Sequence, residues 1–226
     1  MTMDYANYFT GESSEPYTWD AGSAATAQAI AQFIEVPSRI LEVGAGLHPL
    51  FADSTRVDLS AGAHYVGSIE STPFPDRSFD YIVMSHVLEH VKSDMLAVRE
   101  CERLLEPGGR LIVFSPANAS GVCTPKEIER NGHIRRYNRS RVALLESPGF
   151  PCVYFQNVHR AHNLVWNRMK YVLKALNFPF SFIDGRDLYE RKIYRALQPR
   201  AIAALDALDR HMIGHGNALF VFERIK

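Results

Sequence analysis

The chain has 226 residues, of which 46% are hydrophobic and 22% charged, a composition typical of a globular protein with a sizeable core. It excludes disordered, collagen-like and disulfide-scaffold classes. The 25 basic residues balance the 25 acidic residues, so no overall field would hold a nucleic acid or an anionic membrane surface. We therefore expect neither of these as a partner.

The three cysteines are widely spaced and form no CxxC pair, which is typical of reduced thiols rather than of disulfides or zinc ligands. No apolar run approaches the roughly 18 to 20 residues of a membrane span, and the N-terminus lacks a signal-peptide pattern. These features predict a cytoplasmic protein. The length favours one domain over residues 1–226.

The first half of the chain alternates helical and extended patterns. Residues 1–20 carry five aromatic side chains without a regular period and predict an arm that packs on the protein or covers a ligand. Residues 22–35 are alanine-rich and predict a helix. Ser93 and Asp94 predict the start of a second helix, which runs to Leu105 and is closed by a Pro-Gly-Gly turn. Short apolar runs predict strands at 39–43, 55–58, 64–67 and 79–84.

The second half continues this alternation and then interrupts it. Strands are predicted at 110–115 and 152–155, with a helix between them that starts at Asn138 or Ser140. Strands alternating with helices predict an α/β fold with a parallel sheet and helices on both faces. Residues 160–212 contain three helix-like stretches and predict a helical cap inserted before a last strand at 218–224.

A glycine turn follows the first predicted strand. Gly44 and Gly46 would let a ligand approach the backbone closely, and Glu42 could accept hydrogen bonds from an amino group. A dinucleotide site would need a third glycine, but Pro49 stands in its place, and the next acid, Asp58, comes earlier than in such sites. A ligand with an adenosine but no phosphate fits better, with Asp58 accepting the ribose hydroxyls; the alternative is a turn carboxylate at a strand end.

Six segments in register resemble those of the class I S-adenosylmethionine-dependent methyltransferases, and within them the small bacterial type 11-like group. The segments lie at 40–46, 57–58, 67–76, 78–83, 85–91 and 105–113. The resemblance implies a Rossmann-like, seven-stranded, mostly parallel sheet whose last hairpin is reversed. It also implies S-adenosylmethionine as the cofactor.

The resemblance further implies a role for each matching residue. The amino acid part of the cofactor would lie at Glu42 and Gly44-Ala45-Gly46, the ribose at Asp58 with Leu59, and the adenine at Ser68 and Ile69. Ser85 and His86 would line the methionine side and the methyl group. Two positions depart from the family pattern: His48 replaces a frequent glycine, and Ser68 replaces an acid that commonly binds the adenine amino group.

The segment from His86 to His90 also matches H-x-x-E-H, a zinc-hydrolase signature, but that interpretation needs a helix where a strand end is predicted. In some related quinone-pathway methyltransferases the corresponding positions, here His86, Glu89 and His90, bind a divalent metal. The favoured interpretation is that Glu89 and His90 bond to backbone and helix ends. No metal site is predicted.

The acceptor side is predicted from the segment Gly132-His-Ile-Arg-Arg-Tyr137, which also resembles the family pattern. His133, and alternatively His86, would act as general base, and Arg135 and Arg136 would hold a carboxylate or phosphate, with Tyr137 beside them. The alternative is that this segment ties the loop to the sheet edge. His162 and Trp166 would reach the acceptor from the cap, whose apolar side chains pack in a core, cover a pocket or form a homodimer seam.

The sequence therefore predicts a methyltransferase that transfers a methyl group to an O or N atom of a small-molecule metabolite or natural-product intermediate. The alternative hypothesis is a catalytically silent member of the fold that binds a partner.

Overall fold

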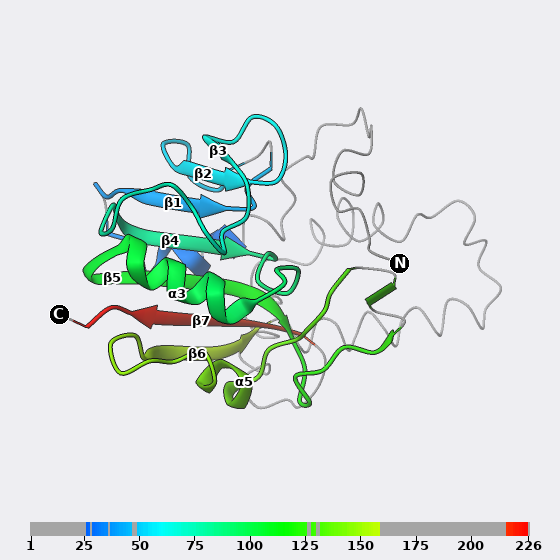
Figure 1. Ribbon diagram of the computed structural model, residues 1–226. Helices are drawn as coiled ribbons and strands as arrows, with labels where there is room; N and C mark the ends of the chain where they lie inside the picture. The colour runs from blue at the N-terminus through cyan, green and yellow to red at the C-terminus, as the bar shows by residue number, and fades with distance from the viewer. Residues whose placement is uncertain are drawn as a thin grey trace, which may run out of the picture.

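The computed structural model describes residues 26–225 except 28, 36, 47–48, 126–127, 130–131 and 159–215. The predicted arm (1–20) and cap (160–212) lie outside the described residues. The described part contains one sheet of seven strands, in the order β3-β2-β1-β4-β5-β7-β6 (Figure 1). The strands are β1 (Ile40–Val43), β2 (Thr55–Asp58), β3 (Tyr65–Val66), β4 (Phe79–Ser85), β5 (Leu105–Ala117), β6 (Cys152–Val158) and β7 (Gly216–Glu223).

The topology confirms the predicted sheet. Strands β1 to β5 pair in parallel, and β7 lies antiparallel between β5 and β6, which makes the reversed last hairpin. The chain leaves β1 toward β2 and β3 on one side and returns to β4 and β5 on the other. The strand order thus reverses between β1 and β4, and open parallel sheets bind ligands at the carboxyl ends of the strands beside such a switch point.

Two helices begin where the sequence predicts. Helix α3 (Asp94–Leu104) starts at Ser93, whose hydroxyl accepts the Leu96 N–H, and α5 (Arg139–Ala143) starts at Asn138 in the same manner. Residues 26–31, position 28 aside, are helical within the predicted 22–35.

Helix α3 ends at Leu104 with Leu105 as its cap, as predicted, but the Pro-Gly-Gly turn expected after it is wrong. Strand β5 begins at Leu105, which pairs with Phe79 of β4. Gly108 N–H donates to the Arg224 carbonyl, and Arg224 N–H donates to the Gly109 carbonyl. These bonds extend the strand pairing through the Pro-Gly-Gly segment that was expected to be a turn.

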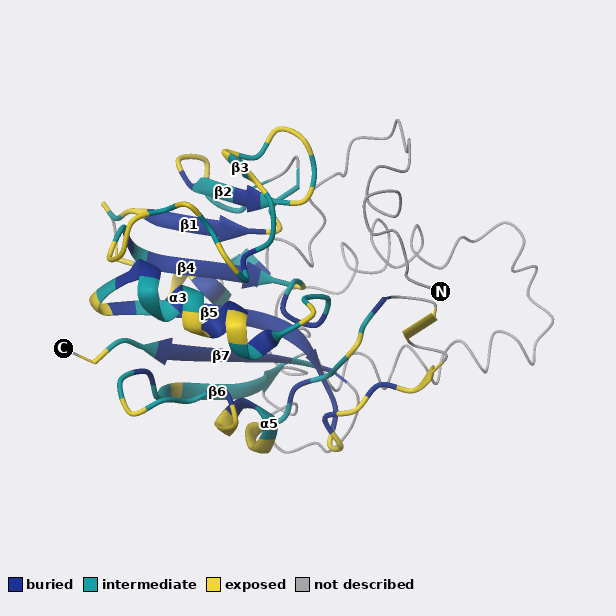
Figure 2. Ribbon diagram, viewed as in Figure 1, coloured by how far each residue is buried: buried dark blue, intermediate teal, exposed yellow. Residues whose placement is uncertain are grey.

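The sheet is covered on both faces. Ile82 and Met84 of β4 pack with the buried side of α3, whereas Tyr81 and Val83 point to the opposite face and pack near Ile30. Successive side chains of a strand face opposite ways, so burial of both sets requires a layer on each side. The central strands β1, β4, β5 and β7 are accordingly the most buried (Figure 2).

In the described part of the chain, every helix falls short of the length and apolarity that crossing a bilayer requires.

Arg224 joins the end of β7 to the end of α3. Its Nη1 donates to the carbonyls of Glu102 (2.8 Å), Arg103 (3.2 Å) and Leu105 (2.5 Å), where the helix leaves its last carbonyls without partners of its own. We predict that Arg224→Met lowers the free energy of unfolding by about 1.5 to 3 kcal/mol, the range for hydrogen bonds to a charged group.

Urea denaturation measures this effect. Arg139→Met is the matched control, because Arg139 is half exposed and pairs with Glu146 near the surface, so its loss should cost at most about 1 kcal/mol. Equal losses in the two variants would contradict the helix-capping role of Arg224.

Candidate active site at the carboxyl edge of the sheet

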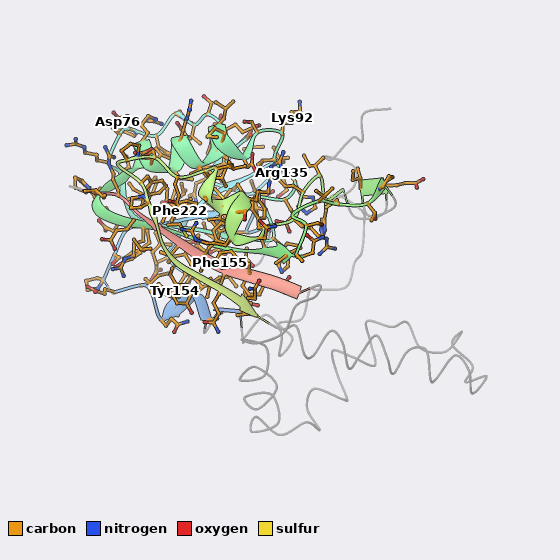
Figure 3. All side chains as sticks on the ribbon, turned by 90° about the horizontal axis from the view of Figure 1, so that it is seen from below. Asp76, Lys92, Arg135, Tyr154, Phe155 and Phe222 are labelled. Carbon is orange, nitrogen blue, oxygen red and sulfur yellow. The ribbon has the colours of Figure 1, made fainter. Side chains whose placement is uncertain are left out.

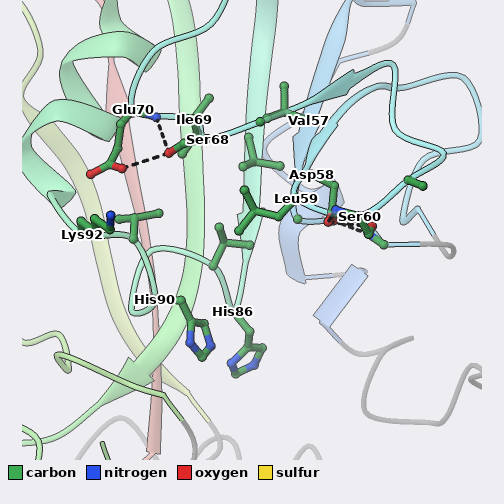
Figure 4. A pocket seen from close by; sticks show the side chains of 17 residues that line it. Val57, Asp58, Leu59, Ser60, Ser68, Ile69, Glu70, His86, His90 and Lys92 are labelled. Atoms are coloured by element: carbon green, nitrogen blue, oxygen red, sulfur yellow. Dashed lines mark hydrogen bonds between the residues drawn. The ribbon is translucent and has the colours of Figure 1, made fainter. Parts of the chain in front are cut away.

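A pocket of about 690 Å³ lies at the carboxyl ends of the parallel strands (Figure 4). Its size is within the range of small-molecule and cofactor sites. It is formed by the turns that follow four strands. The lining residues are Val43, Gly44 and Gly46 after β1; Val57 to Ala61 after β2; Gly67 to Glu70 after β3; and His86, Val87 and His90 to Lys92 after β4.

Gly44 is the residue where the chain turns away from β1. Its φ is +71°, a conformation that L side chains rarely adopt, and its N–H donates to the Val57 carbonyl at 2.8 Å. A Cβ placed on Gly44 would lie 2.3 Å from Cγ2 of Val87. Only glycine therefore fits between β1 and the pocket wall formed by Val87.

The carboxylate of Asp58 connects the turn after β1 to the turn after β2. Oδ2 accepts the Gly46 N–H at 2.8 Å, and Oδ1 accepts both the N–H and the hydroxyl of Ser60, each at 2.8 Å. A carboxylate has about four acceptor positions, so these three bonds leave one unused. Because Asp58 lines the pocket, a ligand could use that position or replace the Ser60 hydroxyl at another.

A second carboxylate organises the turn after β3. The Ser68 hydroxyl donates to Glu70 Oε2 at 3.0 Å and accepts the Glu70 N–H at 3.2 Å, while Glu70 Oε1 accepts the N–H of Ser93. The proton of Ser68 is thus used by Glu70, and its oxygen keeps one acceptor position. Both side chains line the pocket on the side opposite Asp58 in Figure 4.

Two histidines follow β4 at a third part of the pocket (Figure 4). His86 has a φ of +56°, uncommon for a non-glycine residue, and its side chain is 47% exposed. Its Nδ1 lies 3.3 Å from Oε1 of Glu89, which is fully buried and whose Oε2 accepts the Ser115 hydroxyl at 2.8 Å. His90 Nε2 lies 4.0 Å from the same Oε1.

The charge of Glu89 is set by these neighbours. Burial alone would raise its pKa, because a carboxylate loses hydration in the interior, but His86 and His90 favour the ionised form and bring the pKa below its ordinary value. Glu89 is therefore an anion below the pocket floor.

The segment 132–137 crosses over the turn that carries these histidines. Arg135 donates to the carbonyls of Leu88, Val91 and Lys92 and lies beside Lys92 in Figure 3. Tyr137 is fully buried, and its hydroxyl donates to the Leu88 carbonyl. Burial of the phenol, more than any neighbouring charge, raises the pKa of Tyr137 well above its ordinary value.

The structure brings most predicted cofactor residues together. Gly44, Gly46, Asp58, Leu59, Ser68, Ile69 and His86 all line the one pocket. Ala45 and Ser85 are adjacent in sequence to lining residues but are not themselves part of the lining. Their roles as ligand contacts remain predictions.

Glu42 is buried and is not part of the pocket lining. Its carboxylate accepts the N–H of Leu50 at 2.7 Å, the N–H of Phe51 and the hydroxyl of Ser54. Burial raises its pKa, and these bonds oppose that rise. Glu42 therefore organises the loop after the glycine turn, and its role as a ligand contact stays a prediction.

Two of the residues predicted to hold the methyl acceptor make internal hydrogen bonds instead. Arg135 and Tyr137 bond to backbone carbonyls, so the structure supports the alternative in which this segment is tied to the sheet edge. Arg136 and His133 are outside the pocket lining. Burial lowers the pKa of His133, so its ring is neutral near pH 7. His162 and Trp166 lie outside the described residues.

Three arginines in and after this segment, which form a local basic cluster in the sequence, are neutralised within the protein. Arg141 donates to Asp94 at 2.8 Å, Arg135 lies 3.5 Å from the same carboxylate, and Arg139 pairs with Glu146. An anionic acceptor is therefore not favoured by this cluster.

Sequence reasoning missed the contributions of Ser60, Glu70, His90 and Lys92 to the pocket. The available signal was positional: each lies within a few residues of the end of a parallel strand, where ligand sites gather.

The comparisons with known proteins agree with this geometry. Residues 41–113 match the family model described as "Methyltransferase domain". This segment holds β1 except for its first residue, β2 to β4, α3 and every residue that lines the pocket. This part of the chain is a class I S-adenosylmethionine-dependent methyltransferase domain.

Curated relatives match the methyltransferase domain over part of their length. A probable S-adenosylmethionine-dependent methyltransferase of Mycolicibacterium smegmatis is 35% identical over 86 residues, which cover 37% of this chain and 33% of the relative. The ubiquinone/menaquinone biosynthesis C-methyltransferase UbiE of Vibrio cholerae is 37% identical over 85 residues, which cover 32% of this chain and 33% of the relative. The chain thus spans about a third of the length of the curated relatives it matches.

Solved structures share the fold. The [4+2]-cyclase SpnF superposes with a TM-score of 0.58 at 20% identity, over 90% of this chain and 81% of that chain. Phosphoethanolamine N-methyltransferase 2 of Haemonchus contortus, in complex with S-adenosyl-L-methionine, superposes with a TM-score of 0.61 at 15% identity. The match covers 98% of this chain and 56% of that chain.

The glycine turn of the methyltransferase domain gives a test of the pocket geometry. Gly44→Ala should destabilise the protein through two separable effects, contact with Val87 and the positive φ, the second worth about 1 to 2 kcal/mol. In chemical denaturation, adding Val87→Ala to Gly44→Ala should relieve the contact but not the backbone strain. Full recovery in the double variant, or no loss in the single one, would contradict this geometry.

Proposed function

We propose that the protein transfers a methyl group from S-adenosylmethionine to an oxygen or nitrogen atom of a small molecule. The observation that carries this proposal is the pocket itself, in which a glycine turn, a strand-end carboxylate and a histidine surround one space at the switch point of the sheet. The methyltransferase domain and its relatives support the identity of the cofactor.

The proposed cofactor position follows from the polarity of each wall. The amino acid part lies along Gly44-Ala45-Gly46, with Ser85 at the methionine side, and the ribose hydroxyls donate to Asp58, above which Leu59 supplies apolar contact. The adenine lies at Ser68 and Ile69. An exocyclic amino group needs an acceptor, and the Ser68 oxygen offers one because its proton is directed to Glu70. Ser68 thereby replaces the acid that the family pattern has at this position.

The chemistry is an in-line displacement. When bound, S-adenosylmethionine would supply a methyl group on a positively charged sulfur. A lone pair of the acceptor could displace it in line, with the electrons of the sulfur–carbon bond left on neutral S-adenosylhomocysteine. A hydroxyl acceptor must also lose its proton, and an imidazole is suited to take it near neutral pH. The main work of the chain is to align the acceptor with the sulfonium methyl and to exclude water.

His86 is the base that the geometry favours, because it lines the pocket. Its Nδ1 faces the Glu89 carboxylate, so Nδ1 carries the ring proton and Nε2 is left to receive the acceptor proton. Glu89 would act as a positioning residue and would stabilise the imidazolium that forms. His133 lies outside the lining, which makes it the weaker candidate of the two histidines predicted as bases.

A carbon atom is a second candidate for the methyl acceptor. The name of the UbiE relative, a C-methyltransferase, suggests it, and loss of a proton from a hydroxyl on an aromatic acceptor would activate the neighbouring ring carbon.

We also place the reaction in the cytoplasm, which the three free cysteines support.

The cofactor assignment predicts binding of S-adenosylhomocysteine in isothermal titration. Asp58→Ala should weaken this binding by about 1 to 3 kcal/mol, because charged hydrogen bonds to the ribose are lost. Asp53→Ala is the matched control, since Asp53 is an exposed aspartate on the loop before β2 and should leave binding unchanged. An unchanged affinity in Asp58→Ala, or no binding by the wild type at millimolar ligand, would remove Asp58 or the cofactor from the account.

The base assignment predicts a selective kinetic effect. With phenol, enol and amine acceptors, His86→Gln should reduce S-adenosylhomocysteine release about 100-fold or more for hydroxyl acceptors. Amines that are already neutral should be methylated at nearly the wild-type rate.

The control for this experiment is His64→Asn, which removes a histidine that is not part of the pocket lining but retains an acceptor for the Arg56 N–H. If His86→Gln keeps the wild-type rate with a hydroxyl acceptor, His86 is not the base.

A further inference from the structure

We propose that Glu89, His90 and His133 form a binding site for one divalent transition-metal ion of the Zn²⁺ type. One ligand atom from each residue lies within 4.8 Å of the other two. Glu89 and His90 come from the turn after β4, and His133 comes from the segment that crosses over that turn. This site adds to the proposed methyl transfer and does not depend on it.

One polar atom of this cluster, Nδ1 of His133, is buried without a hydrogen-bond partner in the described part of the chain. A buried donor or acceptor that lacks a partner lowers stability, and native proteins rarely leave such an atom unsatisfied without a ligand or a function. Oε1 of the fully buried Glu89 has the His86 ring at 3.3 Å and keeps a second lone pair. A cation between the three side chains would bind that lone pair and give a role to His133.

The ring of His90 is already oriented as a metal ligand. Its Nδ1 lies 3.2 Å from the carbonyl oxygen of Gly132, which can only accept, so Nδ1 carries the proton. In the neutral ring Nε2 then holds a lone pair, and this is the atom that faces Glu89 Oε1 at 4.0 Å. Metal-bound histidines usually donate their other N–H to a carbonyl or carboxylate in this way.

The remaining two ligands are supported in a similar manner. Glu89 Oε2 is held by the Ser115 hydroxyl at 2.8 Å, which fixes the plane of the carboxylate and leaves Oε1 toward the cluster. Each carboxylate oxygen has two lone pairs, so Oε1 can bind an ion and keep its contact with His86. His133 is half-buried and neutral near pH 7, the form in which an imidazole binds metals.

The ligand set selects the class of ion. Two imidazoles and one carboxylate are typical of Zn²⁺ and neighbouring transition metals, whereas Mg²⁺ and Ca²⁺ prefer oxygen ligands throughout. Three protein ligands leave a coordination position open. The bound ion would join the crossing segment to the turn after β4, beside the pocket that His90 lines.

The first test is titration of the chelator-treated full chain with Zn²⁺ alone, without cofactor. We expect one ion per chain and a visible absorption spectrum when Co²⁺ replaces Zn²⁺. His133→Ala should weaken Zn²⁺ binding at least tenfold and abolish the Co²⁺ spectrum, whereas His64→Asn should alter neither. Wild-type binding by His133→Ala, or no binding by the wild type, would overturn the site.

A second variant keeps the proposal testable if loss of a ligand also perturbs folding. Ser115→Ala removes only the support of Glu89 and should weaken Zn²⁺ binding about 10- to 100-fold, the usual effect of losing such a partner, with unchanged circular dichroism. Unchanged Zn²⁺ affinity in a folded Ser115→Ala protein would contradict the role of Glu89. Loss of binding in His86→Ala together with retention in His133→Ala would replace the proposed ligand set and also overturn it.

Discussion

Asp58 holds together the two turns on which the pocket depends. The turn after β1 has a positive φ at Gly44 and at Gly46, and such a turn offers backbone N–H groups that need acceptors. Asp58 takes the Gly46 N–H on one oxygen and Ser60 on the other, while its own carbonyl accepts the Gly67 N–H from the turn after β3. One residue at the end of β2 thus positions three walls of the pocket.

Glu89 has a comparable position on the other side of the pocket. It is a fully buried anion that faces two imidazoles and one hydroxyl, and the backbone carbonyl of the same residue accepts the Ile134 N–H. The turn after β4 and the segment 132–137 therefore share one electrostatic centre. The proposed base, His86, faces this centre directly, and the proposed metal ligands His90 and His133 lie around it. The acceptor side of the pocket is thus coupled to the folding of this segment.

The sheet could be predicted from the sequence because short apolar runs and capping residues such as Ser93 and Asn138 are local signals. The Pro-Gly-Gly segment after α3 was misjudged because its strand pairing comes from Arg224, more than a hundred residues later. Tertiary partners at the site could not be predicted either. Glu42 has the residue type expected for a ligand contact, but only the folded loop shows that its carboxylate accepts bonds from Leu50, Phe51 and Ser54. Likewise, the basic residues near Arg135 could not be recognised as internally paired before Asp94 and the carbonyls of the turn after β4 were placed beside them.

The central claim is that S-adenosylmethionine lies in the pocket with its ribose at Asp58. A crystal structure of the protein with S-adenosylhomocysteine tests it most directly. The account predicts ribose hydroxyls within hydrogen-bond distance of the Asp58 carboxylate, the adenine amino group at the Ser68 oxygen, and the sulfur on the side of His86. A ligand bound elsewhere, or one bound in the pocket with its ribose away from Asp58, would contradict it.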